Sequence, residues 1–255
     1  MAKDNWTHKE LIVALNLYYK LGFTKVKYTH PKIIELAKTI NRTPSAVAYK
    51  LVNFARLDPE LQKRGIKGMS HGSKGENIVW DEFYNDIEKL AQVSEPLLAD
   101  FKNISIEESL QMETYDLPKE GKEREAVVKV RVNQYFFRDV ILALYKNVCC
   151  ITGITIPQLL VAGHILPWAR SKENRMNLSN GLCLNALHDK AFEAGLIAIT
   201  SDYEIKISSV LKKQKKNPNI EKYFLNYENE KIILPHVHLP NPNFLYQHYK
   251  ERFIQ

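Results

Sequence analysis

The stretch from Val161 to Ile199, VAGHILPWARSKENRMNLSNGLCLNALHDKAFEAGLIAI, places His164, Asn180 and His188 in an otherwise apolar segment. A neutral imidazole has an ordinary pKa of about 6.5 and can accept a proton near neutral pH. Such a ring can act as a general base or acid. The residue types therefore suit proton-transfer chemistry, whereas either histidine alone would more often be a packing or surface residue.

The surrounding pattern predicts the elements that must position these residues. Two apolar runs, NVCCITG and LLVAGHI, are separated by the turn-prone Gly153 and Pro157, which is typical of a hairpin. NGLCLNALHDKAFEAG then predicts a turn and a helix that ends at Gly195. Upstream, VVKVRVNQYFFRDVILALYKN predicts a short strand or extended piece leading into a helix. A hairpin followed by a helix would make the two imidazoles converge on one gap the size of an ion.

The ordered set CCITG, GHILPW, Asn180-Gly181 and LHDKAFEAG resembles the HNH endonucleases of the ββα-metal type. The similarity extends to KVRVNQYFFRDVILALYKNVCCITG and to FLYQHYKERF, about the second half of the chain. The resemblance implies that His164 is the general base and that His188 is a metal ligand. It implies that Asn180 either braces the loop and the base, which is the role assigned here, or contributes to the metal site. It also implies one divalent ion, Mg²⁺ or Mn²⁺, and cleavage of DNA to 3′-hydroxyl and 5′-phosphate ends.

One position departs from the family pattern. Many HNH enzymes place Asp or His immediately before the base, as a second metal ligand, but this chain has Gly163 there. Three readings stay open: a metal held by fewer protein groups and more waters, which hard Mg²⁺ tolerates; substitution by a nearby carboxylate such as Asp189 or Glu193; or loss of catalysis.

The first half of the chain predicts a helical unit that resembles a helix-turn-helix. Helices begin after the capping-box residue Thr7, at Pro31 and after Thr43. In IIELAKTINRTPSAVAYKLVNFA a short turn joins the last two, as in DNA-binding motifs. The residues expected to contact DNA are Arg42 in the turn and Ser45, Tyr49, Lys50 and Asn53 on the open face of the following helix. A plain three-helix packing unit with a solvated outer face is the alternative.

Composition supports a polyanionic partner. The formal net charge is +7 and the isoelectric point is near 9.1, which favours DNA or RNA. A basic loop carrying Lys63, Arg64, Lys67 and Lys74 is expected either to lie along phosphates or to be a surface loop. No stretch suits a signal peptide or a membrane span, so we expect a cytoplasmic protein, and three cysteines suit buried thiols better than disulfides.

These patterns predict an α+β protein with a helical DNA-binding-like domain at 1–93, a linker at 94–121 and an HNH endonuclease domain at 122–255. The expected function is a metal-dependent endonuclease acting on double-stranded DNA, in a prokaryotic restriction or phage-defence system. A homodimer would suit a palindromic target. One alternative is a DNA-binding regulator that keeps an inactive HNH scaffold, and another is a nuclease specific for modified DNA or RNA.

Overall fold

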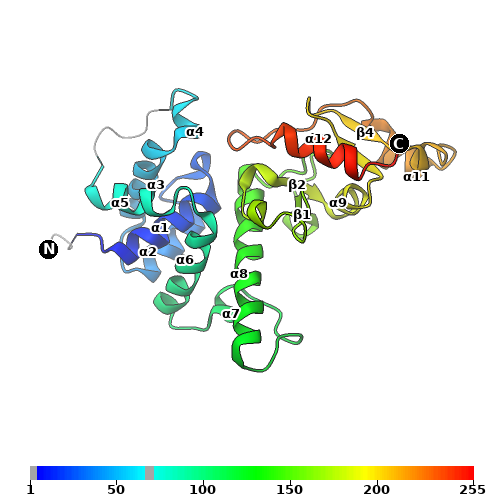
Figure 1. Cartoon of the computed structure of the whole chain (residues 1–255). Helices are drawn as coiled ribbons and strands as arrows, with labels where there is room; N and C mark the ends of the chain where they lie inside the picture. Colours follow the sequence, from blue (N-terminus) through cyan, green and yellow to red (C-terminus); the bar gives the residue numbers. More distant parts are fainter. Residues whose placement is uncertain (1–4, 67–71) are drawn as a thin grey trace. The chain divides into compact units, whose positions relative to one another are not determined.

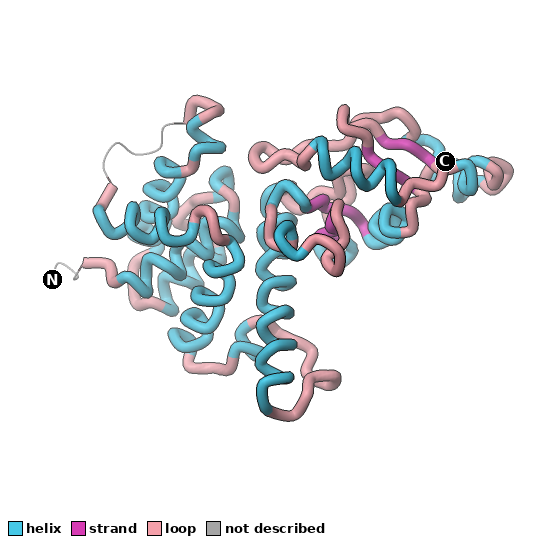
Figure 2. The backbone as a smooth tube through the Cα atoms, in the orientation of Figure 1, coloured by secondary structure: helices cyan, strands magenta, loops and turns pink. Residues whose placement is uncertain are grey.

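The computed structural model describes residues 5–66 and 72–255. The chain divides into two compact units, Met1–Val140 and Ile141–Gln255, and the division falls within one long helix, α8 (Gly121–Leu144). The first unit is helical and the second mixes helices with two small sheets, so the predicted α+β class is confirmed (Figures 1 and 2). Residues 94–121, expected to form a linker, contain helical residues, and Ser94 and Glu95 are buried.

The first unit contains eight described helices and one 3₁₀ turn, counting the part of α8 before Ile141. They are α1 (His8–Leu21), η1 (Phe23–Lys25), α2 (Pro31–Thr39), α3 (Pro44–Leu57), α4 (Pro59–Gln62), α5 (Lys74–Phe83), α6 (Ile87–Lys102), α7 (Ile106–Ser109) and the first part of α8.

The first three helix starts follow from local chemistry, as predicted. Thr7 and Glu10 form a capping box in which each side chain accepts from the other residue's backbone N–H, and α1 ends before Gly22, whose φ of 73° suits glycine. Pro31 opens α2, and the Thr43 hydroxyl accepts from the Ala46 N–H at the start of α3. Helix α1 then packs against α2, α3, α5 and α6, which makes it the centre of this unit.

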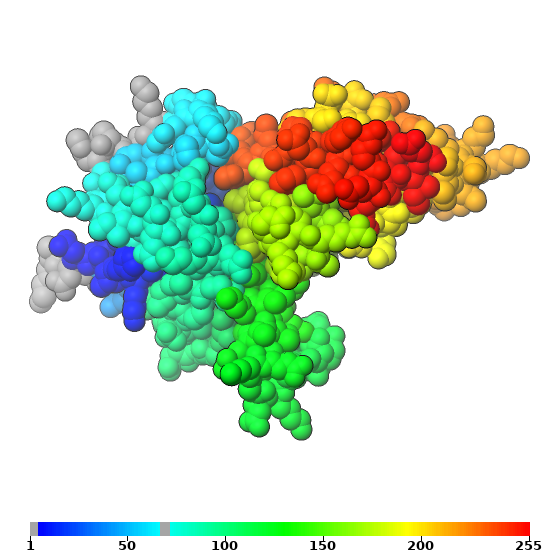
Figure 3. All heavy atoms as spheres, in the orientation of Figure 1, coloured from blue at the N-terminus to red at the C-terminus, as the bar shows by residue number. Residues whose placement is uncertain are grey.

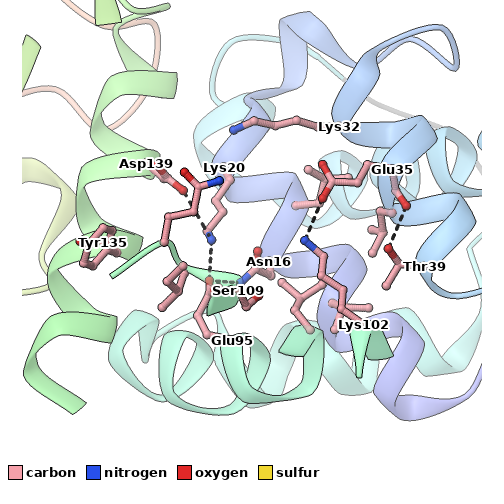
Figure 4. Close-up of a pocket in the computed structure, with 16 residues that line it drawn as sticks. Asn16, Lys20, Lys32, Glu35, Thr39, Glu95, Lys102, Ser109, Tyr135 and Asp139 are labelled. Atoms are coloured by element: carbon pink, nitrogen blue, oxygen red, sulfur yellow. Dashed lines mark hydrogen bonds and ion pairs between the residues drawn. The ribbon is translucent and has the colours of Figure 1, made fainter. Parts of the chain in front are cut away.

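A buried polar cluster ties α1 to α6 beside a cleft of about 430 Å³ (Figure 4). The Glu95 carboxylate accepts from Asn16 Nδ2 at 2.6 Å and pairs with Lys20 Nζ at 2.6 Å. Asn16 also donates to Ser94 Oγ at 2.7 Å, and Asp139 lies 3.5 Å from Lys20. Buried charges are tolerated when they are paired in this way, so the cluster fixes the packing of the two helices.

The second unit carries the predicted ββα arrangement. Its elements after α8 are η2 (Pro157–Leu159), β1 (Leu160–His164), η3 (Lys172–Asn174), η4 (Leu178–Asn180), β2 (Gly181–Asn185), α9 (Ala186–Glu193), β3 (Ile197–Ile199), β4 (Ile205–Ile207), α10 (Ser209–Lys212), α11 (Pro218–Tyr223), η5 (Leu225–Tyr227) and α12 (Pro242–Glu251). Strand β1 pairs antiparallel with β2, with His164 opposite Gly181, and β3 pairs with β4. Helix α9 contacts both strands of the first pair, and α12 contacts β3 (Figure 3 shows α12 in red).

Two local predictions are wrong. The NVCCITG run is not a strand, because the partner of LLVAGHI is β2, and this apolar run is instead buried in turns where Cys150 N donates to Cys183 O at 2.7 Å. The segment from Val127, predicted to begin extended, is helical from its first residue to Leu144. Val132, Phe136 and Val140 are buried at a spacing of four, so helical periodicity outweighs the β-propensity of the valines. No described helix has both the length and the apolar character that crossing a membrane requires.

Candidate active site

His164 ends β1 and lines a pocket of about 200 Å³ in the second unit. Its Nε2 lies 2.9 Å from the backbone carbonyl oxygen of Arg175, which can only accept. In a neutral ring Nε2 therefore carries the hydrogen, and Nδ1 is the nitrogen with the lone pair. Burial lowers the pKa of His164, although the Arg175 carbonyl opposes that shift. The ring is thus held neutral and in one tautomer, which is the state that a general base needs.

The loop after His164 is held from both sides. The ring of Trp168 lies edge-on to the His164 ring, with centroids 5.3 Å apart, and Arg175 Nε donates to the Trp168 carbonyl at 2.7 Å. Arg175 also lies over the Trp168 ring at 5.1 Å. Trp168 is therefore a packing residue that supports the orientation of the base.

Asn180 is fully buried and closes the same loop. Its Oδ1 accepts from Leu166 N at 2.8 Å, and its Nδ2 donates to the carbonyls of Leu166 at 3.2 Å and Asn174 at 3.0 Å. Because both ends of the amide bond to backbone groups and the side chain is buried outside the pocket lining, these contacts favour the bracing role over a ligand role.

The structure does not bring His188 together with His164. His188 is 2% exposed and is not among the residues that line the pocket. Its Nδ1 lies 3.0 Å from Asn185 Oδ1 and its Nε2 lies 2.8 Å from the Tyr223 carbonyl oxygen. Both ring nitrogens thus face protein acceptors, and burial lowers the pKa of the ring. The expected role of His188 as a metal ligand does not fit this geometry, in which it joins α9 to α11.

Asp189, the next residue on α9, faces the position of the missing family ligand. A Cβ at Gly163 would lie 2.5 Å from Asp189 Oδ1, so the carboxylate in this rotamer occupies the space that a side chain at position 163 would need. Burial and, after it, the nearby negative charge of Glu193 raise the pKa of Asp189 to about 6. Glu193 lies one helical turn later and lines the same pocket. The missing side chain at 163 is therefore matched by a carboxylate from the helix.

His248 on α12 is a pocket residue that the sequence did not reveal. Its ring stacks on Phe192, with centroids 3.7 Å apart, and Nε2 lies 3.1 Å from the Phe192 carbonyl oxygen. Nδ1 is buried without a hydrogen-bond partner among the described residues, and burial lowers the pKa to about 4. Only the family-like segment FLYQHYKERF pointed to this helix, and nothing in it singled out the histidine.

The donor groups around the pocket suit a hard cation. In the part of the chain that the structure describes, no three His, Cys, Asp or Glu side chains form a ready metal-binding cluster. Asp189 and Glu193 do line one pocket with His164, and two carboxylates completed by waters are the ligands that Mg²⁺ accepts. The cysteines do not contribute, because Cys149, Cys150 and Cys183 are all free and buried.

Of the residues of the first unit that were expected to contact DNA, some are engaged within the protein and others are exposed. Arg42 forms a bidentate ion pair with Glu10, at 2.8 and 2.9 Å, and its side chain is 8% exposed. Lys50 pairs with the fully buried Glu76, which also accepts from Asn53 Nδ2 at 2.9 Å.

The prediction that Asn53 lies on the open face is wrong, because α5 covers that side of α3 and the residue is 1% exposed. Ser45 and Tyr49 are exposed as expected. Of the predicted basic loop, Lys67 lies outside the described residues, Lys63 pairs with Glu60, and Lys74 begins α5.

Comparison with known proteins agrees with the geometry of the second unit. Residues 149–200 match the family model of an HNH endonuclease, and this range holds β1, β2, α9, His164 and Asn180. Residues 149–200 are therefore similar to the HNH endonuclease family over the hairpin and the helix that follows it. No curated protein matches the chain.

Proposed function

We propose that this protein is a metal-dependent endonuclease that hydrolyses phosphodiester bonds of double-stranded DNA. The observation that carries the proposal is His164, which is kept neutral by burial, held in one tautomer by the Arg175 carbonyl and lines the same pocket as Asp189 and Glu193. The net charge of +7 favours a polyanionic substrate. Asp189 beside Gly163 argues against the alternative of an inactive scaffold, because a carboxylate is present where the family ligand is missing.

In the proposed reaction His164 Nδ1 removes a proton from a water molecule. The water oxygen then bonds to phosphorus as the bond to the 3′ oxygen breaks, and solvent protonates the departing oxygen, which leaves 3′-hydroxyl and 5′-phosphate ends. Asp189 and Glu193 would hold a divalent ion, Mg²⁺ or Mn²⁺, which supplies positive charge for the phosphate and the leaving oxygen. Asn180 keeps the loop from Leu166 to Asn174 in place, and Arg252 adds positive charge to the pocket wall.

Plasmid nicking in Mg²⁺ and in Mn²⁺ tests the base. His164→Ala should lower the cleavage rate at least about 100-fold, since general-base catalysis is worth that much. His8→Ala is the matched control, because it removes a half-exposed imidazole far along the chain and should cut like the wild type. Equal cleavage by wild type and His164→Ala would refute the assignment.

A pair of variants on α9 separates the metal site from the packing of the helix. Asp189→Asn should abolish the stimulation by Mg²⁺ while leaving the melting temperature in EDTA unchanged or higher. His188→Ala should lower the melting temperature in EDTA, because it removes a buried ring that contacts Asn185 and Tyr223 and donates a hydrogen bond to one of them. If His188→Ala lost its dependence on metal but kept the melting temperature of the wild type, His188 would be the metal ligand that the family resemblance implies.

The biological setting that we propose is a prokaryotic restriction or phage-defence system. The helical unit would hold the substrate while the HNH domain cuts it, and a homodimer would cut both strands of a palindromic site. Digestion of unmodified DNA, methylated DNA and RNA distinguishes this function from that of a nuclease restricted to modified DNA or RNA. Sedimentation of the protein tests whether it is a homodimer. Activity on RNA alone would overturn the proposed function.

A further inference from the structure

An open hollow of about 510 Å³ lies beside α3, on the same face as the exposed Ser45 and Tyr49. One wall is the segment between η1 and α2, and the other is a stripe of α3 at the spacing of one helix face. None of the residues that line it is acidic; they are Val26, Lys27, Tyr28, Thr29, Ser45, Ala48, Tyr49 and Val52.

Two tyrosine rings line this hollow in a way that packing does not explain. Tyr28 is 61% exposed and Tyr49 is 47% exposed. Neither ring stacks on another aromatic ring among the described residues, whereas Tyr18 and Tyr19 in the core of the same unit both contact Trp80. Large apolar surfaces left in water on both walls of one hollow mark a place where a ligand binds.

The electrostatic surroundings select the kind of ligand. Lys27 lines the hollow, and Lys25 and Lys32 flank the same segment. Burial and, after it, the positive charges of Lys32 and Lys25 lower the pKa of His30, the residue that follows this segment. A hollow lined by two aromatic rings, apolar side chains and a lysine is complementary to a base with its phosphate, because the rings can stack on the base and the lysine neutralises charge.

We propose that this hollow binds an unstacked nucleobase of the substrate DNA, with the base lying against Tyr28 and Tyr49. The hydroxyls of Thr29 and Ser45 lie on the two walls where they can bond to the base edge, and Val26 and Val52 offer apolar surface to a pyrimidine methyl group. The inference rests on the proposed function in that DNA is the substrate. It adds that the helical unit recognises a base outside the helical stack, with preference for thymine or 5-methylcytosine.

Equilibrium binding in EDTA, followed by fluorescence anisotropy, tests this without cleavage. The probes are a paired duplex, the same duplex with one unpaired thymine, and the same with an abasic site in place of that thymine. The wild type should bind the unpaired-thymine duplex roughly ten-fold tighter than the other two, since stacking on an aromatic side chain contributes about that or more per base.

Variants at the two walls identify the hollow. Tyr49→Ala and Tyr28→Ala should each remove most of the preference for the unpaired thymine, whereas Tyr49→Phe should keep it because the ring remains. Tyr115→Ala is the matched control, because it removes a tyrosine that is 84% exposed elsewhere in the same unit. Circular dichroism of each variant checks folding.

The possible outcomes separate this inference from the proposed function. An unchanged thymine preference in Tyr49→Ala and Tyr28→Ala, with plasmid nicking intact, overturns the inference alone. If the wild type prefers the unpaired-thymine duplex but does not nick the plasmid, the proposed function alone is overturned. A self-association that Tyr49→Ala abolishes, with DNA binding unaffected, would assign the hollow to a second copy of the chain and also overturn the inference.

Discussion

The cleft of the first unit and the pocket of the second unit are both polar, but they differ in whether their titratable side chains are paired. In the cleft, Lys20 pairs with Glu95, and Lys102 pairs with Glu35 (Figure 4). In the pocket, Asp189 has no hydrogen bond or ion pair to any described residue, and the Nδ1 of His248 has no partner there.

The pKa shifts express the same difference. Burial lowers the pKa of Lys20, but the charges of Glu95 and Asp139 outweigh burial and raise it. In the pocket, burial dominates and makes the neutral forms of Asp189 and His248 easier to reach. Paired charges stabilise a fold, whereas unpaired titratable groups in a cleft are typical of a site that handles protons or cations.

The largest expected effect on stability comes from breaking the paired cluster. Glu95→Gln leaves Lys20 buried without its nearest countercharge, so the free energy of unfolding should fall by about 3 kcal/mol. Urea denaturation at pH 7 measures it. A loss below about 1 kcal/mol would mean that Asp139 or water replaces the carboxylate.

The pH dependence of stability should come from the second unit. The folded pKa of His248 is about 4 and an unfolded histidine has about 6.5, so the unfolded state binds more protons between these values. The stabilisation is complete above pH 6.5 and decreases as pH falls toward 4, by up to about 3 kcal/mol. His248→Phe should reduce the difference between the free energies of unfolding at pH 7.5 and at pH 4.5. The same difference in wild type and variant would contradict an origin in His248.

The matched change in the pocket should have the opposite sign to Glu95→Gln. Asp189→Asn removes a half-buried carboxylate that has no ion-pair partner among the described residues, so the free energy of unfolding at pH 7 in EDTA should rise by up to roughly 1 kcal/mol after allowance for solvent screening. Urea denaturation of both variants side by side checks the contrast. A loss in Asp189→Asn equal to that in Glu95→Gln would erase the distinction between the two regions.

The smallest effect should come from the rim of the cleft. Lys102 and Glu35 pair at 2.8 Å, but their side chains are 30% and 60% exposed. Lys102→Ala should therefore change the free energy of unfolding by less than about 1 kcal/mol. A loss in Lys102→Ala as large as that in Glu95→Gln would mean that the exposed ion pair stabilises the fold as much as the buried one.

Local sequence signals determined several parts of this protein. The capping residues Thr7 and Thr43 and the proline Pro31 predicted where three helices begin, because caps act on backbone groups within one turn. The ordered motif around His164 and Asn180 predicted the ββα domain, because a strand end, a bracing amide and a following helix lie within one short segment.

Tertiary structure alone decided which side chains meet. The face of α3 that holds Lys50 and Asn53 looks open in sequence, but Glu76 of α5 covers it. His188 and Asp189 are neighbours in the chain, yet one turns toward Tyr223 and the other toward Gly163, because successive helix residues point about 100° apart and only packing selects the face. His248 reaches the pocket from more than fifty residues beyond α9, a separation over which periodicity and capping carry no information.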